Sequence, residues 1–392
     1  MIIVGAILVS LPVGFGLYAY VLYPMILRIM GARFSRAKSP ARSAIETPLV
    51  TIVVPAYNEA HQIRQTIAAL LAQDYPADRR QILILSDAST DGTDGIVRDH
   101  ETDGVELLRM PNRSGKTAAE NASLSRIRGE IVVNTDASVR LHPQAVRLLV
   151  EAMADPTVGV ASTRDVSITA QENANHAEGS YVGYEMGVRA LETAAGGIVG
   201  ASGSGYAIRS ALHRVRVRED LSRDFSAALT AQRHGFRAVS VEDAICYVPR
   251  SLALDHEYRR KVRTISRGME TLYFNRDLLN PVVHRSFAWK LLSHKLCRWF
   301  VPLTAVPALV GIALLAISFP VGFAVLGIGL GVVALSIAGA TWPGHRPVPR
   351  WLPAGMLGAL AANLAVIHSA WRFFHGHEDH VWEPTRRAAA SV

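Results

Sequence analysis

Three short apolar segments of the chain each run into a carboxylate side chain, and this pattern limits the possible folds. The segments and the carboxylates that follow them are 49–55 with Glu59, 81–86 with Asp87, and 130–135 with Asp136. Continuous apolar runs of this length are typical of strands buried on both faces of a parallel sheet. Because ligands of open α/β sheets bind beyond the carboxyl ends of the strands, these carboxylates are placed to hold a metal ion or a diphosphate.

Helix-like stretches alternate with these segments. The predicted order is strand 49–55, helix about 60–73, strand 81–86, helix about 93–100, strand 105–110, helix about 116–128 and strand 130–135. This alternation predicts an α/β fold with a doubly wound sheet. After Val158 the pattern becomes mixed, and we expect a helix around 173–192, a glycine-rich turn at 200–205 and a helix around 222–234.

Two long blocks of the chain contain no charged residue. Residues 2–27 are long enough for one membrane span, and residues 299–344 are long enough for two spans of about 20 residues each. Residues 351–371, interrupted only by His368, are a weaker candidate for another span. A cleaved signal peptide is disfavoured for the first block because no positive side chain precedes its apolar core.

The distribution of positive charge sets the expected orientation and partners. Five basic residues follow the first apolar block, namely Arg28, Arg33, Arg36, Lys38 and Arg42. The positive-inside rule therefore predicts a cytoplasmic location for the following domain. Much of the net charge of +8 lies beside apolar blocks, so anionic membrane lipids are expected partners and nucleic acid is not. Cys246 and Cys297 are isolated and indicate neither disulfides nor a zinc site.

The segment 281–298 interleaves aromatic and leucine side chains with cations, which favours a helix lying in the membrane interface. A soluble helix packed on the preceding domain is the alternative. The boundaries that we expect are an N-terminal transmembrane helix at 1–27, a basic linker at 28–47, a cytosolic α/β domain at 48–280, the interfacial helix at 281–298, two or three transmembrane helices at 299–374 and a tail at 375–392.

Four motifs occur in the order that is typical of one enzyme family. They are Pro55-Ala-Tyr-Asn-Glu59, Ser86-Asp-Ala-Ser-Thr-Asp-Gly-Thr93, Gly115-Lys-Thr-Ala-Ala-Glu-Asn121 and Thr135-Asp-Ala-Ser138. This set resembles the donor-site motifs of the family 2 inverting glycosyltransferases, over roughly residues 48–270, and the apolar flanks resemble the membrane-bound members. The resemblance implies a GT-A fold and a UDP-sugar donor.

By this resemblance, Glu59 and Asp87 accept hydrogen bonds from the nucleotide base, and Pro55 and Tyr57 belong to the same donor site. The alternatives are a helix-start charge for Glu59 and a turn residue for Asp87, since acidic residues are common at both positions.

Lys116 is expected to contact the donor from the start of a helix. A phosphate-binding P-loop is excluded, because that motif requires a glycine where this chain has Met110. A solvated lysine is the alternative.

The metal site of the family is altered in this chain. The usual Asp-x-Asp is here Asp136-Ala-Ser138, and a hydroxyl is a weaker ligand than a carboxylate for hard divalent cations. We expect Mg²⁺ or Mn²⁺ to be held by Asp136, the diphosphate and water, with Ser138 contributing weakly. A degenerate, inactive site is the alternative.

The acceptor side is predicted in the second half of the domain. Asp224 resembles the family aspartate that begins a helix and deprotonates the acceptor, with Glu219 and Asp220 as nearby competitors. An acidic residue in the first turn of a helix is also favoured by the helix dipole alone. The residues expected to approach the acceptor are Gly203, Ser204 and Gly205.

Arg260, Arg263 and Thr264 stand where polymer-making relatives have Gln, Arg and Trp. Arg260 is expected on the donor, and Arg263 is expected to stabilise the departing diphosphate through charge-assisted hydrogen bonds. The missing Trp favours the addition of one or a few sugars. A cationic helix face on the membrane is the alternative interpretation.

The leading hypothesis is a multi-pass plasma-membrane enzyme that transfers a sugar from a UDP-sugar to a glycan or lipid acceptor, with possible export partners. The alternatives are a polyprenyl-phosphate sugar synthase and a non-catalytic nucleotide-binding scaffold of a polysaccharide exporter. The His-rich segment 375–380 is interpreted as a solvated tail rather than a metal site.

Overall fold

The protein is described by a computed structural model that covers residues 1–34, 47–168, 176–249, 254–343 and 354–376. It divides into two compact units. The sheet unit contains the described residues of 30–172 and 182–250, and the helical unit contains those of 1–29, 173–181 and 251–377. Residues 28–34 of the expected basic linker lie in the helix α2 (Tyr23–Phe34), whereas residues 35–46 of the linker and most of the tail lie outside the described residues.

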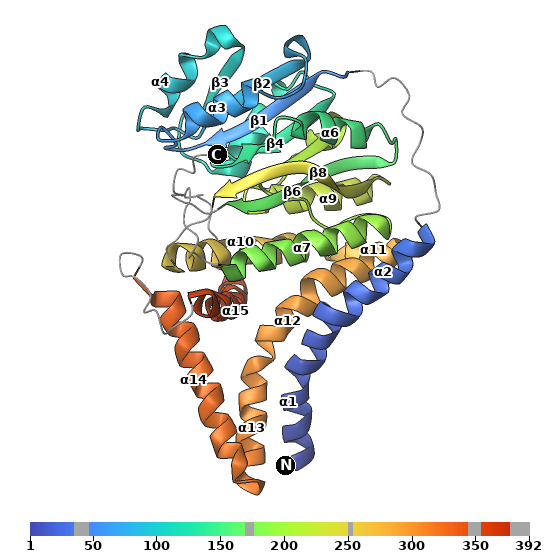
Figure 1. Cartoon of the computed structure of the whole chain (residues 1–392), viewed down its shortest axis with the longest axis vertical. Helices are drawn as coiled ribbons and strands as arrows, with labels where there is room; N and C mark the ends of the chain where they lie inside the picture. Colours follow the sequence, from blue (N-terminus) through green and yellow to red (C-terminus); the bar gives the residue numbers. More distant parts are fainter. Residues whose placement is uncertain (35–46, 169–175, 250–253, 344–353, 377–392) are drawn as a thin grey trace. The chain divides into compact units, whose positions relative to one another are not determined.

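The sheet unit is built on one eight-stranded sheet with the strand order β3-β2-β1-β4-β7-β6-β8-β5 (Figure 1). The strands are β1 Val50–Ala56, β2 Arg80–Ser86, β3 Val105–Arg109, β4 Ile131–Thr135, β5 Arg140–Leu141, β6 Val158–Ile168, β7 Gly205–Arg209 and β8 Arg237–Pro249. The four strands from β3 to β4 are parallel, as the alternating pattern predicts, whereas β7 is antiparallel to both of its neighbours. The sheet is therefore mixed.

Helices cover both faces of the sheet, which explains the continuous apolar strands. Every residue of β1 is buried. Val54 and its even-numbered neighbours pack with helices α3 (Ile63–Leu71) and α6 (Ala145–Met153). Val53 faces the other side, in the cluster that includes residues of α5 (Lys116–Ala122) and α9 (Arg223–Arg233). The predicted doubly wound arrangement is confirmed.

The helix predicted around 116–128 is shorter in the structure. α5 ends at Ala122 and a 3₁₀ turn follows at Ser123–Ser125. The Ser123 hydroxyl donates to the carbonyl of Glu120 at 2.7 Å, a local bond of the kind that competes with helix continuation. Gly129 then approaches β1 so closely that a Cβ there would lie 2.5 Å from the Thr51 nitrogen.

The helical unit contains the apolar segments. Its elements are α1 Ile2–Leu17 with a π turn at Tyr18–Leu22 leading into α2 Tyr23–Phe34, then α10 Leu254–Phe274, α11 Pro281–Leu291, a π turn at Leu292–Leu296, α12 Cys297–Leu303, α13 Ala305–Ser318, α14 Val321–Thr341 and α15 Ala354–Phe374. Among the described helices, Ile2–Ala32 and Val321–Thr341 are long and apolar enough to cross a membrane. A third span is possible by length if Pro281–Leu303 and Ala305–Ser318, which meet at a 40° bend, act as one.

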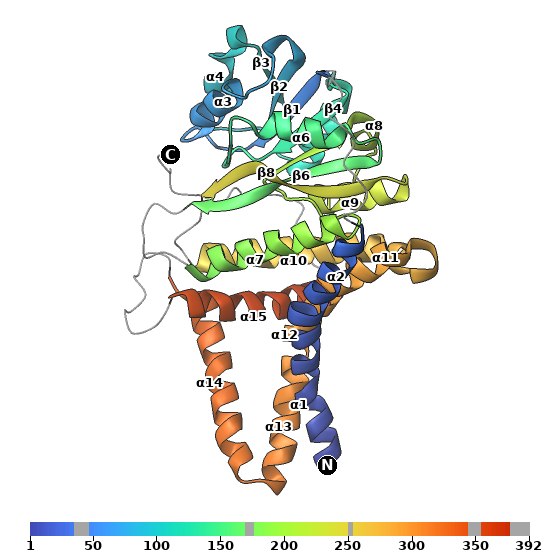
Figure 2. The same cartoon turned by 45° about the vertical axis from the view of Figure 1, so that its right-hand side comes forward.

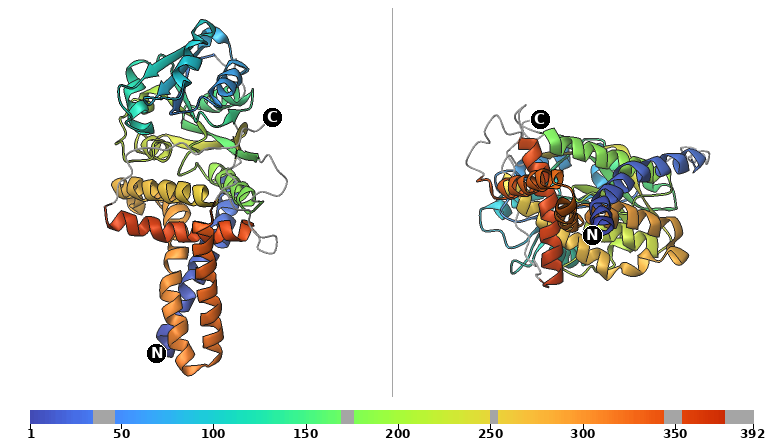
Figure 3. Two further views of the ribbon diagram at one scale, coloured as in Figure 1. Left: turned by 90° about the vertical axis from the view of Figure 1, so that its left-hand side faces the viewer. Right: turned by 90° about the horizontal axis from the view of Figure 1, so that it is seen from below.

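Helix α15 runs across the direction of α13 and α14 within the helical unit (Figures 2 and 3). It packs against α10, where the Ser369 hydroxyl donates to the Val262 carbonyl at 3.0 Å and the Tyr258 hydroxyl lies 3.0 Å from His368 Nδ1. α15 is not among the candidate spans found in the described residues.

Candidate functional site

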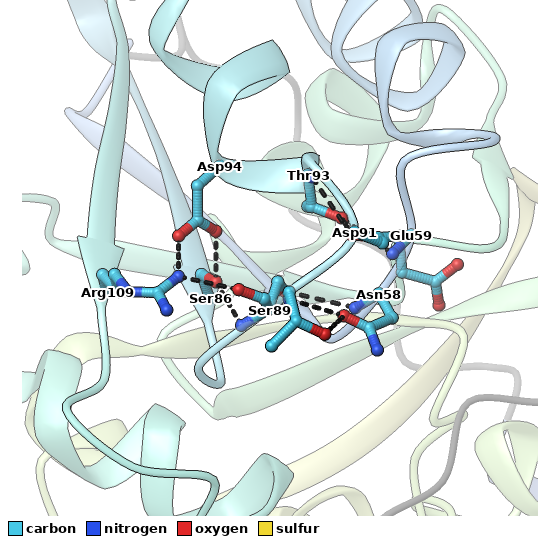
Figure 4. Close-up of polar contacts among 9 residues, drawn as sticks. Asn58, Glu59, Ser86, Ser89, Asp91, Thr93, Asp94 and Arg109 are labelled. Atoms are coloured by element: carbon cyan, nitrogen blue, oxygen red, sulfur yellow. Dashed lines mark hydrogen bonds and ion pairs between the residues drawn. The ribbon is translucent and has the colours of Figure 1, made fainter.

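The loops that follow β1 and β2 are tied together by polar side chains (Figure 4). The Asp91 carboxylate accepts from the backbone nitrogens of Ala60 at 3.0 Å and Thr93 at 3.1 Å, and the Glu59 nitrogen donates to the Thr93 hydroxyl at 2.9 Å. Although partial burial would raise it, the pKa of Asp91 is held below its usual value by the bonds from Thr93 and Ala60. Asn58, at φ +52°, accepts from the Thr90 nitrogen at 2.8 Å. These contacts fix the end of β1 against the end of β2.

The Glu59 side chain lies inside this loop framework and is only 1% exposed. Its carboxylate accepts a hydrogen bond from the Gln62 amide, and its carbonyl accepts from the Gln62 and Ile63 nitrogens where α3 begins. Burial lowers the pKa of the neighbouring Arg140, and the Glu59 carboxylate partly offsets this effect. These contacts join Glu59 to the residues that precede α3. Its contact with a nucleotide base stays a prediction.

Asp87 organises the start of α5. It is 2% exposed, and its two carboxylate oxygens accept from the backbone nitrogens of Ser114 at 2.7 Å and Gly115 at 2.8 Å. Gly115 has φ +94°, a conformation that glycine adopts without the penalty of a side chain. Both oxygens of the Asp87 carboxylate thus bind a distant segment of the chain. The contact of Asp87 with the nucleotide base stays a prediction.

Two supporting contacts at this edge have no counterpart in the sequence predictions. The guanidinium of Arg113 lies 4.0 Å from the centroid of the Tyr57 ring, within the range of a cation–π interaction. Asp94, 8% exposed, accepts from the Ser86 hydroxyl and pairs with Arg109 (Figure 4). Each contact joins residues from different segments, so no local sequence pattern predicts it.

Lys116 and Asp136 form an ion pair at the carboxyl end of β4. The Lys116 Nζ lies 2.6 Å from Asp136 Oδ1, and each side chain is 22% exposed. Burial alone would lower the pKa of Lys116, but the carboxylates of Asp136, Glu120 and Asp224 hold it above its usual value. The ammonium group is therefore charged, and the two residues that the motifs assign to the donor do lie together.

Asp224 lies in the first turn of α9, against the glycine-rich turn. A Cβ placed on Gly203 would be 2.9 Å from the Asp224 Oδ2, so a side chain there would displace the carboxylate. The Ser222 hydroxyl donates to Asp224. Because Asp224 also raises the pKa of Lys116, the acceptor-side and donor-side residues lie within electrostatic range of each other. The competitor Asp220 is paired with Arg218 at 2.7 Å, and Glu219 is exposed.

Side chains from the strands β4 and β6 bind the glycine-rich turn. The Ser202 hydroxyl donates to Asp165 at 2.6 Å, and the Thr135 hydroxyl donates to the Ser204 carbonyl at 2.8 Å. A Cβ on Gly205 would lie 2.8 Å from a Thr163 carbon, so this position excludes larger residues. The turn that the sequence assigns to the acceptor is therefore fixed beside Asp224.

A buried polar cluster lies behind these residues. Glu120 is 1% exposed, Asn134 and Tyr206 are each 3% exposed, and Asn134 on β4 stands directly opposite Tyr206 on β7. Burial raises the pKa of Glu120, although Lys116 and Arg223 oppose the shift. Burial also raises the pKa of Tyr206 well above its usual value, with Glu120 adding to the effect. No sequence pattern points to this cluster, because it is assembled from a helix and two strands.

Arg223 links α9 to α5 beside this cluster. It is 5% exposed and donates to the Asn121 side chain at 2.8 Å and to the His213 carbonyl at 2.8 Å. Burial, followed by Arg223, holds the pKa of His213 well below its usual value, so this imidazole is neutral at neutral pH. The arrangement fixes the start of α9 and with it Asp224.

The residues at the end of β4 fit a divalent cation that a diphosphate helps to hold. Within the described residues no group of three His, Cys, Asp or Glu side chains could hold a metal alone. Asp136 supplies one carboxylate, and the Ser138 side chain nearby in the chain is 7% exposed. One or two carboxylates completed by substrate phosphates and water are the usual protein environment of Mg²⁺.

Arg260 and Arg263 lie on α10, in the helical unit. Arg260 is paired with Glu257 on the same helix, with nitrogen–oxygen distances of 2.5 Å and 2.9 Å. Their roles toward a diphosphate stay predictions.

Comparison with known proteins gives consistent matches. The family model described as "Glycosyl transferase family 2" matches residues 51–213. Glycosyltransferase AglE of Haloferax volcanii is 32% identical over 99 residues, which are 25% of this chain and 33% of that protein. Probable glycosyltransferase YdaM of Bacillus subtilis is 34% identical over 110 residues, 27% of this chain and 26% of that protein. Beta-monoglucosyldiacylglycerol synthase of Synechocystis is 32% identical over 127 residues, 31% of this chain and 26% of that protein. The matches thus span a third or less of each of these relatives.

Among solved structures, the mannosyltransferase PcManGT from Pyrobaculum calidifontis, in complex with GDP-Man and Mn²⁺, has a TM-score of 0.68 with this chain. The likeness covers 95% of this chain and 100% of that one at 22% sequence identity. It supports the fold of the chain.

Proposed function

The chain is a member of glycosyl transferase family 2 through residues 51–213, and from this premise we propose that the whole protein is a membrane-anchored inverting glycosyltransferase. It takes a sugar from a UDP-sugar and transfers it to a glycan or lipid acceptor associated with the membrane, in the synthesis of cell-envelope or extracellular polysaccharide. The relatives match only part of the chain, so donor, acceptor and partners belong to this proposal.

One observation carries the proposal. Asp136 at the end of β4, Lys116 at the start of α5 and Asp224 at the start of α9 come from distant parts of the sequence, yet each carboxylate acts on the same ammonium group. The first two carry the charges that a nucleotide diphosphate requires, and the third provides a carboxylate that can take a proton. A purely structural role would not require three ionisable groups beside a glycine-rich turn that excludes side chains.

The proposed mechanism follows from this placement. The Asp224 carboxylate accepts the proton of the acceptor hydroxyl as the oxygen attacks the anomeric carbon, and the Ser222 hydroxyl holds that carboxylate in place. The Lys116 ammonium stabilises negative charge on the departing diphosphate. Gly203 leaves room for the acceptor beside Asp224. Arg263, which lies on α10, is proposed to assist the departure of the diphosphate from the anomeric carbon.

A divalent cation, Mg²⁺ or Mn²⁺, is proposed to bind Asp136 together with the diphosphate and water, with Ser138 as a weak further contact. When bound, it would neutralise charge on the leaving nucleotide. The PcManGT structure is a complex with GDP-Man and Mn²⁺, which supports both a nucleotide-sugar donor and a divalent cation for this chain.

The proposed location is the plasma membrane, with several spans and the sheet unit in the cytoplasm. The two candidate spans and the basic residues that follow the first apolar block support this topology. Membrane lipids are therefore proposed partners. The similarity to a protein named as a diacylglycerol glycolipid synthase supports a lipid acceptor. A polyprenyl phosphate is the competing acceptor, and its phosphate would need no general base.

The proposal is tested with the full chain purified in detergent and incubated with a panel of UDP-sugars and with GDP-mannose, each with Mg²⁺ or Mn²⁺. We expect one UDP-sugar to give rapid nucleotide release that depends on the metal and increases when membrane lipid extract is added. Release of nucleotide from no donor, with or without lipid, would contradict the proposed activity. A preference for GDP-mannose would contradict the proposed base while leaving the reaction class intact.

A further inference from the structure

Glu120 is a buried carboxyl group whose position is not explained by the roles assigned so far. It lies four residues after Lys116 on α5, and residues with this spacing are neighbours on one face of a helix. It is 1% exposed, and its Oε2 has no hydrogen-bond partner among the residues that the structure describes. A carboxyl oxygen buried in this way is costly unless it acquires a donor or a cation.

The ion pair at the end of β4 creates a conflict for metal binding. Lys116 Nζ lies 2.6 Å from Asp136 Oδ1, and the proposed divalent cation requires the same carboxylate. A second cation beside the ammonium group would be strongly repelled in this poorly hydrated place. When the metal uses Asp136, Lys116 loses this partner. The diphosphate then supplies one anion to the ammonium group, and a carboxylate of the protein can supply a second.

Few carboxylates near Lys116 could replace Asp136 as its partner. Besides Asp136, the carboxylates that act on it are Glu120 and Asp224. Asp224 is engaged by the Ser222 hydroxyl, lies against Gly203 and is needed for the acceptor proton. Glu120 lies on the same helix as Lys116 and has an oxygen that accepts no bond from the described residues.

Burial disfavours the charged form of Glu120, whereas the positive charges of Lys116 and Arg223 favour it. Asn134 is 3% exposed, and neither polar atom of its side chain has a partner in the described part of the chain. Tyr206 stands opposite Asn134, and Arg223 contributes a positive charge that favours the ionised form of Glu120. Glu120 therefore lies among polar and charged side chains.

We propose that Glu120 is the second counter-ion of Lys116: when Asp136 binds the divalent cation, the Lys116 ammonium exchanges Asp136 for Glu120 and still faces the diphosphate. Glu120 is thus a positioning residue that acts through Lys116 and makes Asp136 available to the metal. The proposal rests on the proposed function.

A double-mutant cycle tests it with the full chain in detergent at pH 8. The four proteins are the unaltered chain, Glu120→Gln, Lys116→Met and the double variant. Calorimetry with saturating UDP gives the Mn²⁺ concentration for half-saturation. We expect Glu120→Gln to raise this concentration about tenfold, within the range of coupling between contacting residues. The same change in the Lys116→Met background should alter it less than about twofold, because no ammonium then competes for Asp136.

Two further variants separate this role from a structural one. Glu120→Asp keeps the charge but removes a buried methylene, so it should remain within about threefold of the unaltered chain in Mn²⁺ binding, and a pure packing role would make it worse than Glu120→Gln. Glu151→Gln, on α6 where Glu151 pairs with Arg147 at 2.6 Å, removes one carboxylate elsewhere and should leave Mn²⁺ binding unchanged.

The outcomes are distinct. Suppose that UDP and Mn²⁺ bind the unaltered chain. The inference is then overturned if Glu120→Gln leaves the Mn²⁺ concentration for half-saturation unchanged, or if it shifts this concentration equally in the unaltered and the Lys116→Met backgrounds. An unaltered chain that binds no UDP in the presence of Mn²⁺ overturns the proposed function, and this inference with it. If Glu120→Gln unfolds, Glu120→Ala, which also removes the charge and suits a helix position, takes its place in the same cycle with the same expected shifts.

Discussion

Replacing Asp136 with alanine is expected to abolish sugar transfer, by a factor of at least about 10³, while the sheet unit stays folded. The loss of charge stabilisation on a leaving group typically costs about 10²–10³ for a single neutral donor, and Asp136 is proposed to place a whole divalent cation. Its side chain is 22% exposed at the end of β4, where it pairs with Lys116. Nucleotide release in Mg²⁺ or Mn²⁺ measures activity, and calorimetry with UDP measures Mn²⁺ binding.

A matched control for this variant is Asp74→Ala. Asp74 is an exposed carboxylate that pairs with Arg147 at 2.8 Å, away from the end of β4. Exposed pairs contribute at most about 1 kcal/mol to stability, so the control should fold and retain near-full turnover. Near-full turnover in Asp136→Ala as well would refute the assignment of metal and diphosphate to this carboxylate.

Asp224→Asn should lower transfer to a hydroxyl acceptor by about 10²–10⁴, the usual cost of losing a general base. The amide keeps the shape of the carboxylate and can still accept the hydrogen bond from Ser222, so the start of α9 should be preserved. Binding of the UDP-sugar, followed by calorimetry, should stay within a few-fold. Transfer is measured under single-turnover conditions, which separate the chemical step from product release.

The competitor Asp220 supplies the control for this experiment. Asp220→Asn disturbs the pair with Arg218 and should leave transfer nearly unchanged. If instead Asp224→Asn transfers normally and Asp220→Asn does not, the base has been assigned to the wrong residue. Normal transfer in both variants would favour a phosphate acceptor, such as a polyprenyl phosphate, which needs no base.

The parts of the fold that could be predicted from sequence are those governed by local pattern. The apolar run of β1 and its neighbours predicts a sheet covered on both faces, and the structure confirms helices on each side. The family resemblance assigned Lys116 and Asp136 to the donor and assigned Gly203 and Asp224 to the acceptor, and the structure brings the members of each pair together. Their roles stay predictions. The end of α5 could not be predicted from the sequence; there the Ser123 hydroxyl bonds to the Glu120 carbonyl and a 3₁₀ turn follows.

The details of the site depend on contacts between segments that are far apart in sequence. Asp87 has the composition of a turn residue or a ligand contact, yet both of its oxygens bind backbone nitrogens 27 and 28 residues away. Glu120 lies within the motif at 115–121, and the sequence predicts no role for it. Its burial emerges when α5 packs on the face of the sheet that carries Val53 and Leu83. Such roles require the tertiary structure, because charge and burial there come from different elements.

Asp224 is proposed to activate an acceptor for a single in-line displacement at the anomeric carbon. The most direct measurement is the proton NMR spectrum of the product isolated from the unaltered chain with its preferred UDP-sugar. Since one displacement inverts the anomeric centre, an α-linked donor should give a β-linked product, identified by its anomeric coupling constant. A product with retained α configuration would contradict the account.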